Sequence, residues 1–171
     1  MDILQTQRLD LIPVTNEFLK MLIAEEYTVA GELLGVMVPQ GWPFEEAPRA
    51  GLSIHLAAME EDPSEYLWRI RLIVLRSNRT VIGSINLKGP PERKGGTVEI
   101  GWGVSFEYRR QGIATEAAQT VIDWALSQPG VRRVIATIPD DNLASKELAE
   151  RLGMQYTQEI HRNLPVWELS R

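Results

Sequence analysis

The first third of the chain alternates between strand-like and helix-like spacing of its apolar residues. Residues 3–14 predict a first strand, and Pro13 near its end indicates an edge position, because proline cannot donate a hydrogen bond to a neighbouring strand. Thr15 is a residue type that caps helices, and it precedes four apolar residues at helical spacing, Phe18, Leu19, Leu22 and Ile23. Residues 31–44 contain several glycines and prolines and predict a short helix and a loop, and residues 52–59 predict a further helix.

The spacing changes to a period of two in the middle of the chain, where apolar and polar residues alternate. We expect three antiparallel strands here, over residues 68–74, 80–87 and 97–105. A turn at 77–79 and a run rich in glycine and proline at 89–96 separate them.

The last third of the chain predicts helices and strands in alternation. Apolar residues recur every three or four positions over 113–127 and indicate a long helix, which Pro129 and Gly130 end. Asn142 is a second residue of a capping type, and Gly153 suits the end of the helix that Asn142 would begin. The strands that we expect around these helices span residues 131–138, 154–160 and 164–169.

This order of elements predicts an α+β fold with a mixed sheet. The three central strands favour antiparallel pairing, whereas a strand–helix–strand unit favours a parallel pair. The length of 171 residues is close to that of one domain, so we expect residues 1–171 to form a single domain.

Composition narrows the class of protein. Hydrophobic residues make up 44% of the chain and charged residues 24%, which is typical of a folded globular protein and not of a disordered one. The absence of cysteine excludes disulfides, thiolate metal sites and cysteine-linked intermediates, and two histidines argue against a metal site built on several of them. The net charge of −5 argues against nucleic-acid binding. The first residues have no basic region, and no apolar run approaches about 20 residues, so we expect a cytoplasmic protein with no membrane partner.

The strand predicted over 97–105 carries an unusual set of residues on one face. A period of two places Glu99 beside Gly101 and Gly103, while apolar side chains point to the other face. Glycine weakens strands and often marks the close approach of a ligand. We therefore expect room for a ligand on the face that carries Glu99.

The loop that follows this strand leads directly into the long helix. A helix start offers N–H groups without partners and the positive end of the helix dipole. Arg109 and Arg110 add positive charge, and Gly112 allows close approach to the main chain. These features predict an anion site suited to phosphate, with an ordinary strand–helix turn as the alternative. The lysine of a phosphate-binding loop and the third glycine of the dinucleotide fingerprint are both missing, which argues against nucleoside triphosphate and NAD binding.

The residues Arg109-x-x-Gly112-x-Ala114 resemble the pyrophosphate-binding signature of the GNAT superfamily of acyl-CoA-dependent N-acyltransferases. Other stretches are similar to its branch of ribosomal-protein-alanine acetyltransferases, namely Thr6-x-Arg8-Leu9-x-Leu11, Glu99-Ile100-Gly101-Trp102, Gly112-Ile113-Ala114-Thr115-Glu116-Ala117, Asn142-x-x-Ser145 and Leu152-Gly153-Met154. The resemblance implies a mixed, mostly antiparallel sheet of six or seven strands, splayed in the middle, with helices on both faces.

The same resemblance implies acetyl-CoA as co-substrate, held where the sheet splays, and no metal. The residues that it assigns to acetyl-CoA binding are Trp102, Gly103, Val104, Arg109, Arg110, Gln111, Gly112, Ile113, Ala114, Thr115, Asn142 and Ser145.

The activity that the resemblance implies is N-acetyl transfer from acetyl-CoA to a primary amine. Because the chain has no cysteine to carry the acetyl group, we expect direct attack in a ternary complex. Residues 31–59, which shape the acceptor pocket in the family, match no pattern that names the acceptor. A protein N-terminus, a polyamine, an amino sugar and an amino acid all stay open, and a homodimer is compatible with the resemblance.

Glu99 and Ser145 are the predicted catalytic residues. The attacking amine must lose a proton, and a partly desolvated carboxylate has a raised pKa that suits a general base. The alternative for Glu99 is an ion pair with Arg69 or Arg71. Many members of the family use a tyrosine on the late helix to assist the departing thiolate, and Ser145 takes its place here. The alternative for Ser145 is a role, with Asn142, at the start of that helix.

Several other side chains have a functional and a structural interpretation. Trp42, Phe44 and Trp68 are candidate walls of the acceptor pocket, with a role in the core as the alternative. His55 and His161 are expected to be incidental to catalysis. The competing functions are a non-catalytic acyl-CoA sensor or interaction domain and a nucleotide-binding α/β protein, the latter weakened by the missing lysine.

Overall fold

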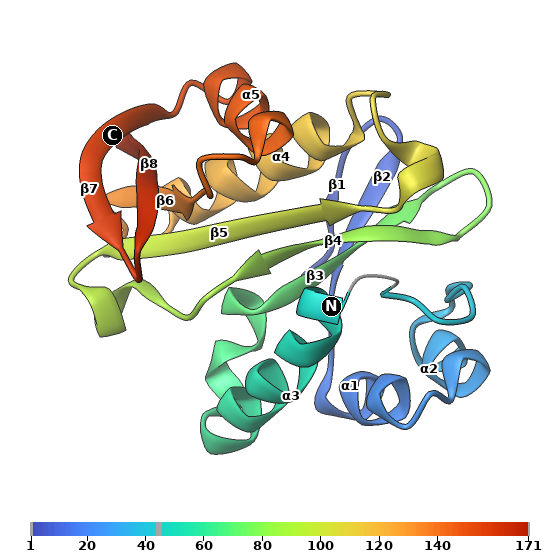
Figure 1. Cartoon of the computed structure of the whole chain (residues 1–171). Coiled ribbons are helices and arrows are strands. Elements are labelled where there is room, and N and C mark those ends of the chain that lie inside the picture. The colour runs from blue at the N-terminus through green and yellow to red at the C-terminus, as the bar shows by residue number, and fades with distance from the viewer. Residues whose placement is uncertain (1, 44–45, 171) are drawn as a thin grey trace.

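The computed structural model describes residues 2–43 and 46–170, and its centre is an eight-stranded sheet in the order β1-β2-β3-β4-β5-β6-β8-β7 (Figure 1). The strands are β1 (Leu4–Gln5), β2 (Leu9–Pro13), β3 (Ile70–Leu75), β4 (Val81–Leu87), β5 (Thr97–Val104), β6 (Arg133–Thr137), β7 (Gln155–His161) and β8 (Leu164–Ser170). Strands β5 and β6 pair in parallel, and the other described pairs are antiparallel. The predicted mixed, mostly antiparallel α+β sheet is confirmed, with one strand more than expected.

Helices cover both faces of the sheet (Figure 1). On one face lie α4 (Ile113–Ser127) and α5 (Leu143–Arg151), and on the other α1 (Asn16–Ile23), α2 (Tyr27–Leu34) and α3 (Glu46–Glu61). Short 3-10 helices stand in three connections, η1 (Pro63–Trp68), η2 (Pro91–Lys94) and η3 (Phe106–Tyr108). Over the described residues, none of these helices has both the length and the apolar character that crossing a membrane requires.

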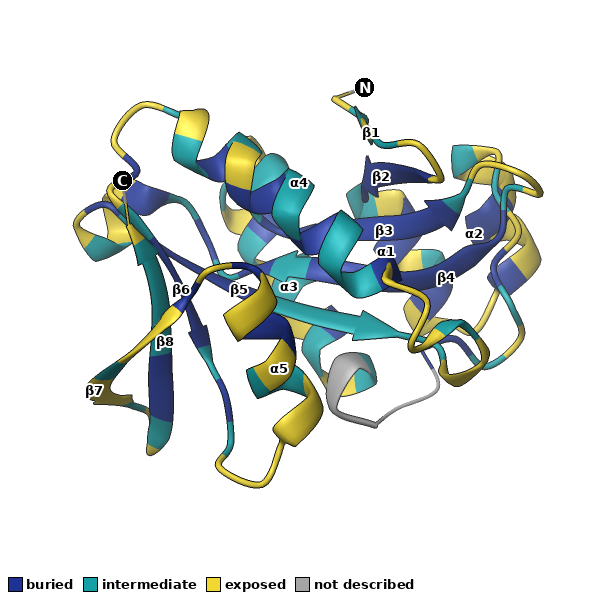
Figure 2. Ribbon diagram, turned by 90° about the horizontal axis from the view of Figure 1, so that it is seen from above, coloured by how far each residue is buried: buried dark blue, intermediate teal, exposed yellow. Residues whose placement is uncertain are grey.

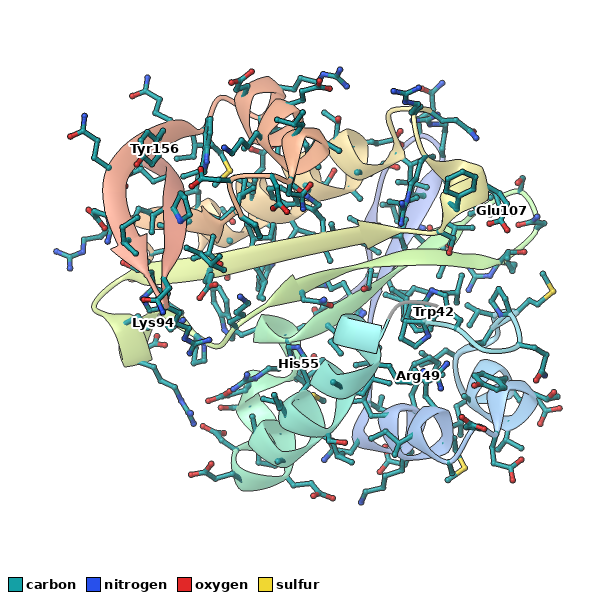
Figure 3. The ribbon with its side chains drawn as sticks, in the orientation of Figure 1. Trp42, Arg49, His55, Lys94, Glu107 and Tyr156 are labelled. Atoms are coloured by element: carbon teal, nitrogen blue, oxygen red, sulfur yellow. The ribbon has the colours of Figure 1, made fainter. Side chains whose placement is uncertain are left out.

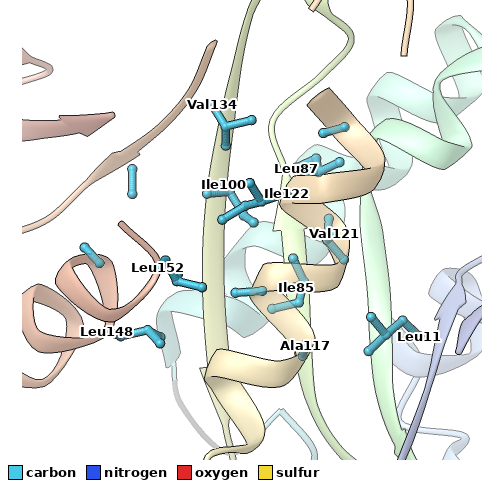
Figure 4. Close-up of a cluster of buried hydrophobic side chains, with 14 of the residues drawn as sticks. Leu11, Ile85, Leu87, Ile100, Ala117, Val121, Ile122, Val134, Leu148 and Leu152 are labelled. Atoms are coloured by element: carbon cyan, nitrogen blue, oxygen red, sulfur yellow. The ribbon is translucent and has the colours of Figure 1, made fainter. Parts of the chain in front are cut away.

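Each face of the sheet has its own hydrophobic core. The core under α4 and α5 includes Ile85, Ile100 and Val121 (Figure 4). The core under α1 and α3 includes Phe18 and Leu72. The buried residues of α4 belong to the first of these cores with residues of the strands, and Figure 2 shows them in dark blue between less buried positions of the helix. Because side chains alternate along a strand, β5 sends its even-numbered residues to α4 and its odd-numbered residues to the other face.

Helix α4 begins and ends where the sequence predicts, over Ile113–Ser127. Its apolar residues recur on one side, so burial of that side against the sheet stabilises the helix. The predicted helix caps are also confirmed, because Thr15 Oγ1 accepts a hydrogen bond from Phe18 N at 3.2 Å and Asn142 Oδ1 accepts one from Ser145 N at 3.1 Å.

The single strand predicted over residues 3–14 is wrong. The chain turns after β1, where Thr6 N donates to the Leu9 carbonyl at 2.9 Å, and β1 pairs back on β2. Pro13 lies beyond the part of β2 that β1 covers, which is why proline is tolerated there. The helix expected after residue 31 begins earlier, at Tyr27, and ends where Gly35 adopts a positive φ of 64°.

Candidate functional site

The sheet opens between β5 and β6, at Glu99. Strand β6 pairs with β5 only over Thr97–Glu99, whereas β4 pairs with β5 over the following residues as far as Val104. Within the described sheet, the side of β5 that faces β6 therefore has no strand partner beyond Glu99. This separation is the splay that the sequence resemblance implies.

A groove of about 1000 Å³ runs from this opening between the end of β5 and the first turns of α4 and α5. All the predicted cofactor-binding residues except Gln111 line it. The residues concerned are Trp102, Gly103, Val104, Arg109, Arg110, Gly112, Ile113, Ala114, Thr115, Asn142 and Ser145. The fold thus gathers into one groove residues that are more than 40 positions apart in the chain, as the span from Trp102 to Ser145 shows.

The start of α4 forms one end of this groove. Gly112 is the N-terminal cap with a positive φ of 74°, and among the described residues no side chain caps the helix there. The first N–H groups of a helix have no partner within the helix, and they carry the positive end of its dipole. Arg109 and Arg110 line the groove beside them. Arg109 is oriented by a hydrogen bond from its Nε to the Val104 carbonyl, at 2.8 Å.

The start of α5 forms the facing wall. Trp102 on β5 reaches across the groove, and its indole Nε1 donates to the Ser145 hydroxyl at 3.3 Å. Because the hydroxyl oxygen accepts this bond, its own proton stays available to a further acceptor. The predicted helix-start role of Asn142 is confirmed by its bond to the Ser145 main chain, and this role does not occupy the Ser145 hydroxyl.

Glu99 is fully buried at the base of the opening, in an ion-paired cluster. Its carboxylate accepts hydrogen bonds from the Lys88 ammonium, from the Thr137 hydroxyl at 3.0 Å and from Lys94 Nζ at 3.3 Å. His161 Nε2 lies 3.9 Å from the same carboxylate. Lys94 lies toward the start of β5, away from Trp42 (Figure 3).

Two expectations about Glu99 are wrong. Burial on its own raises the pKa of Glu99, but the bonds from Lys88, Thr137 and Lys94 outweigh burial and leave the pKa below its ordinary value, not above it. The partners are lysines and not Arg69 or Arg71. Arg69 instead pairs with Glu65, and Arg71 lies under Trp124 with its guanidinium carbon 4.7 Å from the ring centre.

The cluster around Glu99 contains residues that sequence reasoning missed. Lys88 and Lys94 stand in connections whose path only the fold reveals. Thr137 was open to prediction, because the parallel pairing of Glu99 with Ile135 places it two positions further along β6. His161 approaches this cluster, which the sequence did not indicate, and its expected lack of a catalytic role stays a prediction. The pKa of the other histidine, His55, is lowered to about 4. Burial is the main cause, and the charges of Arg69 and Lys88 add to it.

A second cavity, of about 320 Å³, lies on the opposite face of β5. Trp42 and Ser84 line it, together with four residues that also line the groove, Gly103, Val104, Phe106 and Arg109. A methyl group added at Gly101 or Gly103 would have no neighbour within 4 Å, so the expected space on this face of the strand is confirmed.

The predicted acceptor-pocket walls separate in the structure. Trp42 lines the smaller cavity (Figure 3). Trp68 does not, because it packs against Trp124 on the α4 face with ring centres 4.8 Å apart. Phe44 lies outside the described residues. Glu99 lines neither cavity.

Comparison with known proteins gives the same family as the resemblance in the sequence. The family model for the acetyltransferase (GNAT) domain matches residues 8–155. An uncharacterized N-acetyltransferase of Bacillus subtilis, YjdG, is 39% identical over 82 residues, which are 48% of this chain and 48% of YjdG. The match therefore spans about half the length of this curated relative.

Solved structures with the same fold cover nearly the whole chain. A ribosomal-protein alanine acetyltransferase from Vibrio fischeri superposes with a TM-score of 0.68 at 14% identity, over 99% of this chain and 97% of that one. The ribosomal-protein acetyltransferase RimL, solved in complex with coenzyme A, superposes with a TM-score of 0.63 at 13% identity, over 99% and 98% of the two chains. At such identities these likenesses establish the fold. The match of the family model over most of the chain establishes more: this protein belongs to the GNAT acetyltransferase family.

Proposed function

We propose that this protein transfers an acetyl group from acetyl-CoA to a primary amine by direct attack in a ternary complex. The observation that carries the proposal is that two cavities on opposite faces of β5 share four lining residues. The larger groove offers space for a cofactor and the smaller cavity space for an acceptor. Two substrates bound in this way would meet at the end of β5 without a covalent enzyme intermediate.

The residues of the groove fit acetyl-CoA. The uncapped first turn of α4 and the adjacent Arg109 and Arg110 suit the pyrophosphate. The main chain of Gly103 and Val104, on the edge of β5 that β6 leaves unpaired, suits the pantetheine arm. Bound acetyl-CoA supplies a thioester, whose carbonyl carbon accepts the amine.

Glu99 is the group that we propose takes the proton of the amine. It lines neither cavity and stands four residues, or about 13 Å, before Gly103 on β5, so the proton would pass along a chain of water molecules. Its lowered pKa leaves it ionised at neutral pH, which is the protonation state that a base needs. A low pKa also makes a weak base. Since general-base catalysis contributes about 10²–10⁴-fold, we expect Glu99 to contribute near 10².

Ser145 is the group that we propose assists the departing thiolate. The Ser145 hydroxyl oxygen accepts a hydrogen bond from Trp102 Nε1, so the hydroxyl proton of Ser145 is free to point into the groove. A neutral hydrogen bond of this kind contributes about 0.5–1.5 kcal/mol. Its effect on the rate is therefore smaller than that of Glu99.

The release of free thiol from acetyl-CoA, measured against a panel of primary amines, tests the proposed activity. We expect release that needs both the protein and an amine, and the amine that gives the highest kcat/KM identifies the acceptor class. Tight CoA binding without thiol release, for every amine in the panel, would contradict acetyl transfer and support an acyl-CoA sensor.

The variant Glu99→Gln tests the proton transfer separately. Glutamine keeps the shape but cannot accept the proton, so we expect kcat to fall by about 10² at neutral pH. The loss should shrink as the pH rises, because more of the amine is then unprotonated. A kcat per folded molecule that matches the wild type at every pH would show that Glu99 has no part in the chemistry.

A further inference from the structure

The first turn of α4 carries a negative charge at the end of the groove where the proposed function places a pyrophosphate. Glu116 lies in this turn. A carboxylate at a helix N-terminus interacts favourably with the helix dipole, but it also repels a second anion at the same place. Glu116 does not line the groove, and its surroundings explain how the two negative charges can coexist.

Both oxygens of the Glu116 carboxylate are bound by the turn between β1 and β2. Arg8 Nε donates to Oε2 at 2.7 Å, and Arg8 Nη2 lies 2.6 Å from the same oxygen. The Thr6 hydroxyl and the Arg8 main-chain N–H, the latter at 3.2 Å, donate to Oε1. Burial on its own raises the pKa of Glu116, but these bonds outweigh it and hold the pKa below its ordinary value. The carboxylate is therefore ionised and its charge is balanced by Arg8.

The same guanidinium also holds the loop that precedes α4. Arg8 Nη1 donates to the Gln111 carbonyl at 2.9 Å. In a trans peptide the N–H points opposite to the C=O. The bond to Arg8 therefore turns the N–H of Gly112 away from Arg8, and Gly112 is a residue that lines the groove. Arg8 thus contacts the cofactor end of α4 from behind, through a carboxylate and a carbonyl.

We propose that Arg8 is a positioning residue for acetyl-CoA: it masks the charge of Glu116 and fixes the Gln111–Gly112 peptide so that the start of α4 accepts a pyrophosphate. This inference rests on the proposed function. It gives the hairpin at the beginning of the chain a role in cofactor affinity, although the hairpin lines neither cavity.

Isothermal titration with CoA tests the proposal on four proteins: the wild type, Arg8→Gln, the double variant Arg8→Gln/Glu116→Gln and Arg76→Gln. We expect Arg8→Gln to raise the Kd for CoA about tenfold, because one positive charge is lost and one negative charge is unmasked. The double variant should bind more tightly than Arg8→Gln alone, since no unmasked carboxylate remains. A merely structural role of Arg8 predicts no such rescue.

Arg76→Gln is the matched control. Arg76 holds the same hairpin, through a bond from its Nη1 to the Thr6 carbonyl at 2.9 Å, and its side chain is 47% exposed against 43% for Arg8. It contacts neither Glu116 nor Gln111 in any described bond, so its removal should leave the Kd for CoA at the wild-type value.

The outcomes separate this proposal from the proposed function. A wild type that does not bind CoA overturns the function and the proposal with it. A wild type that binds CoA, with Arg8→Gln binding as tightly or the double variant showing no recovery, overturns the role of Arg8 alone. If Arg8→Gln does not fold, Arg8→Lys replaces it. A single ammonium cannot hold both partners, so weaker CoA binding is expected, and unchanged binding contradicts the proposal.

Discussion

Replacing Glu99 with glutamine should destabilise the fold, independently of any effect on the rate. The side chain is fully buried and ties Lys88 on the connection after β4, Lys94 in η2 and Thr137 on β6 to one point of β5. Glutamine keeps the volume and one acceptor oxygen but removes the negative charge. The two lysines then lose the charge that balances them at the base of the opening.

The size of the loss in the free energy of unfolding follows from how deeply Glu99 and its lysine partners are buried. Removing one partner of a fully buried ion pair costs about 3–5 kcal/mol. The side chains of Lys88 and Lys94 are 39% and 30% exposed and can turn toward water, which reduces the cost. We therefore expect a loss of about 2–3 kcal/mol in the free energy of unfolding at pH 7. For a chain of this length each kcal/mol lowers Tm by about 2–4 °C, so Tm should fall by roughly 4–12 °C.

The pH dependence of this loss in the free energy of unfolding shows whether it comes from the charge of Glu99. Because the pKa of Glu99 is lower in the folded state than in the unfolded one, its contribution is present in full above the unfolded value of about 4.3. The contribution is lost as the pH falls through the folded pKa. Urea unfolding of both proteins at intervals from pH 7 to pH 3 should therefore show their free energies of unfolding converging toward the acid end.

The matched control is Glu159→Gln. Glu159 lies on β7, is 54% exposed and pairs with Arg133 at 3.3 Å. An exposed pair contributes about 0–1 kcal/mol, so this variant should unfold close to the wild type at all pH values. A loss for Glu99→Gln no larger than that of Glu159→Gln, or a loss that stays constant down to pH 3, would refute the assignment of Glu99 as an ion-paired anchor.

Two further variants test other parts of the account. Ser145→Ala should lower kcat about two- to tenfold with little change in CoA affinity, because one hydrogen-bond donor is removed. Steady-state kinetics and a melting curve of the same sample test this. An unchanged kcat with a lower Tm would show that Ser145 serves only the start of the helix. Arg71→Met should leave the free energy of unfolding unchanged or raise it by up to about 2 kcal/mol. The reason is that the buried Nε and Nη2 of Arg71 have no hydrogen-bond partner among the described residues and that burial lowers the pKa of Arg71 to about 10. A loss of more than about 2 kcal/mol in urea unfolding would contradict this.

The fold was predictable from the sequence where a local signal and the tertiary packing agree. Helix α4 is the clearest case, since a glycine before it, a proline after it and an apolar stripe between them all set the same bounds. The predicted groove residues come together because most of them stand in one strand–loop–helix segment, whose order in the chain already places them side by side. Ser145 joins them through α5, which the capping residue Asn142 locates.

The surroundings of Glu99 were not predictable in the same way. The side chain faces away from Arg71, because Arg71 lies on the α4 side of β3 and Glu99 on the other side of β5. Its lysine partners come from connections, where hydrophobic periodicity gives no information about direction. The sequence therefore predicts a carboxylate on the open face of the strand, but neither its ion pairs nor the sign of its pKa shift.

The central claim is that the groove between β5, α4 and α5 holds CoA at the start of α4. Isothermal titration of CoA into the wild type, Gly112→Trp and Gly35→Trp tests it most directly. Gly112 and Gly35 both have a positive φ, of 74° and 64°, so the two variants share the same backbone strain, but only Gly112 lines the groove. A Cβ at Gly112 would also lie 3.6 Å from Arg8 Nη2, so Gly112→Trp disturbs the start of α4 on both sides, whereas a Cβ at Gly35 meets nothing within 4 Å. The account predicts that the wild type and Gly35→Trp bind CoA with similar Kd values and that folded Gly112→Trp shows no measurable binding. CoA binding by folded Gly112→Trp at the wild-type Kd would contradict it.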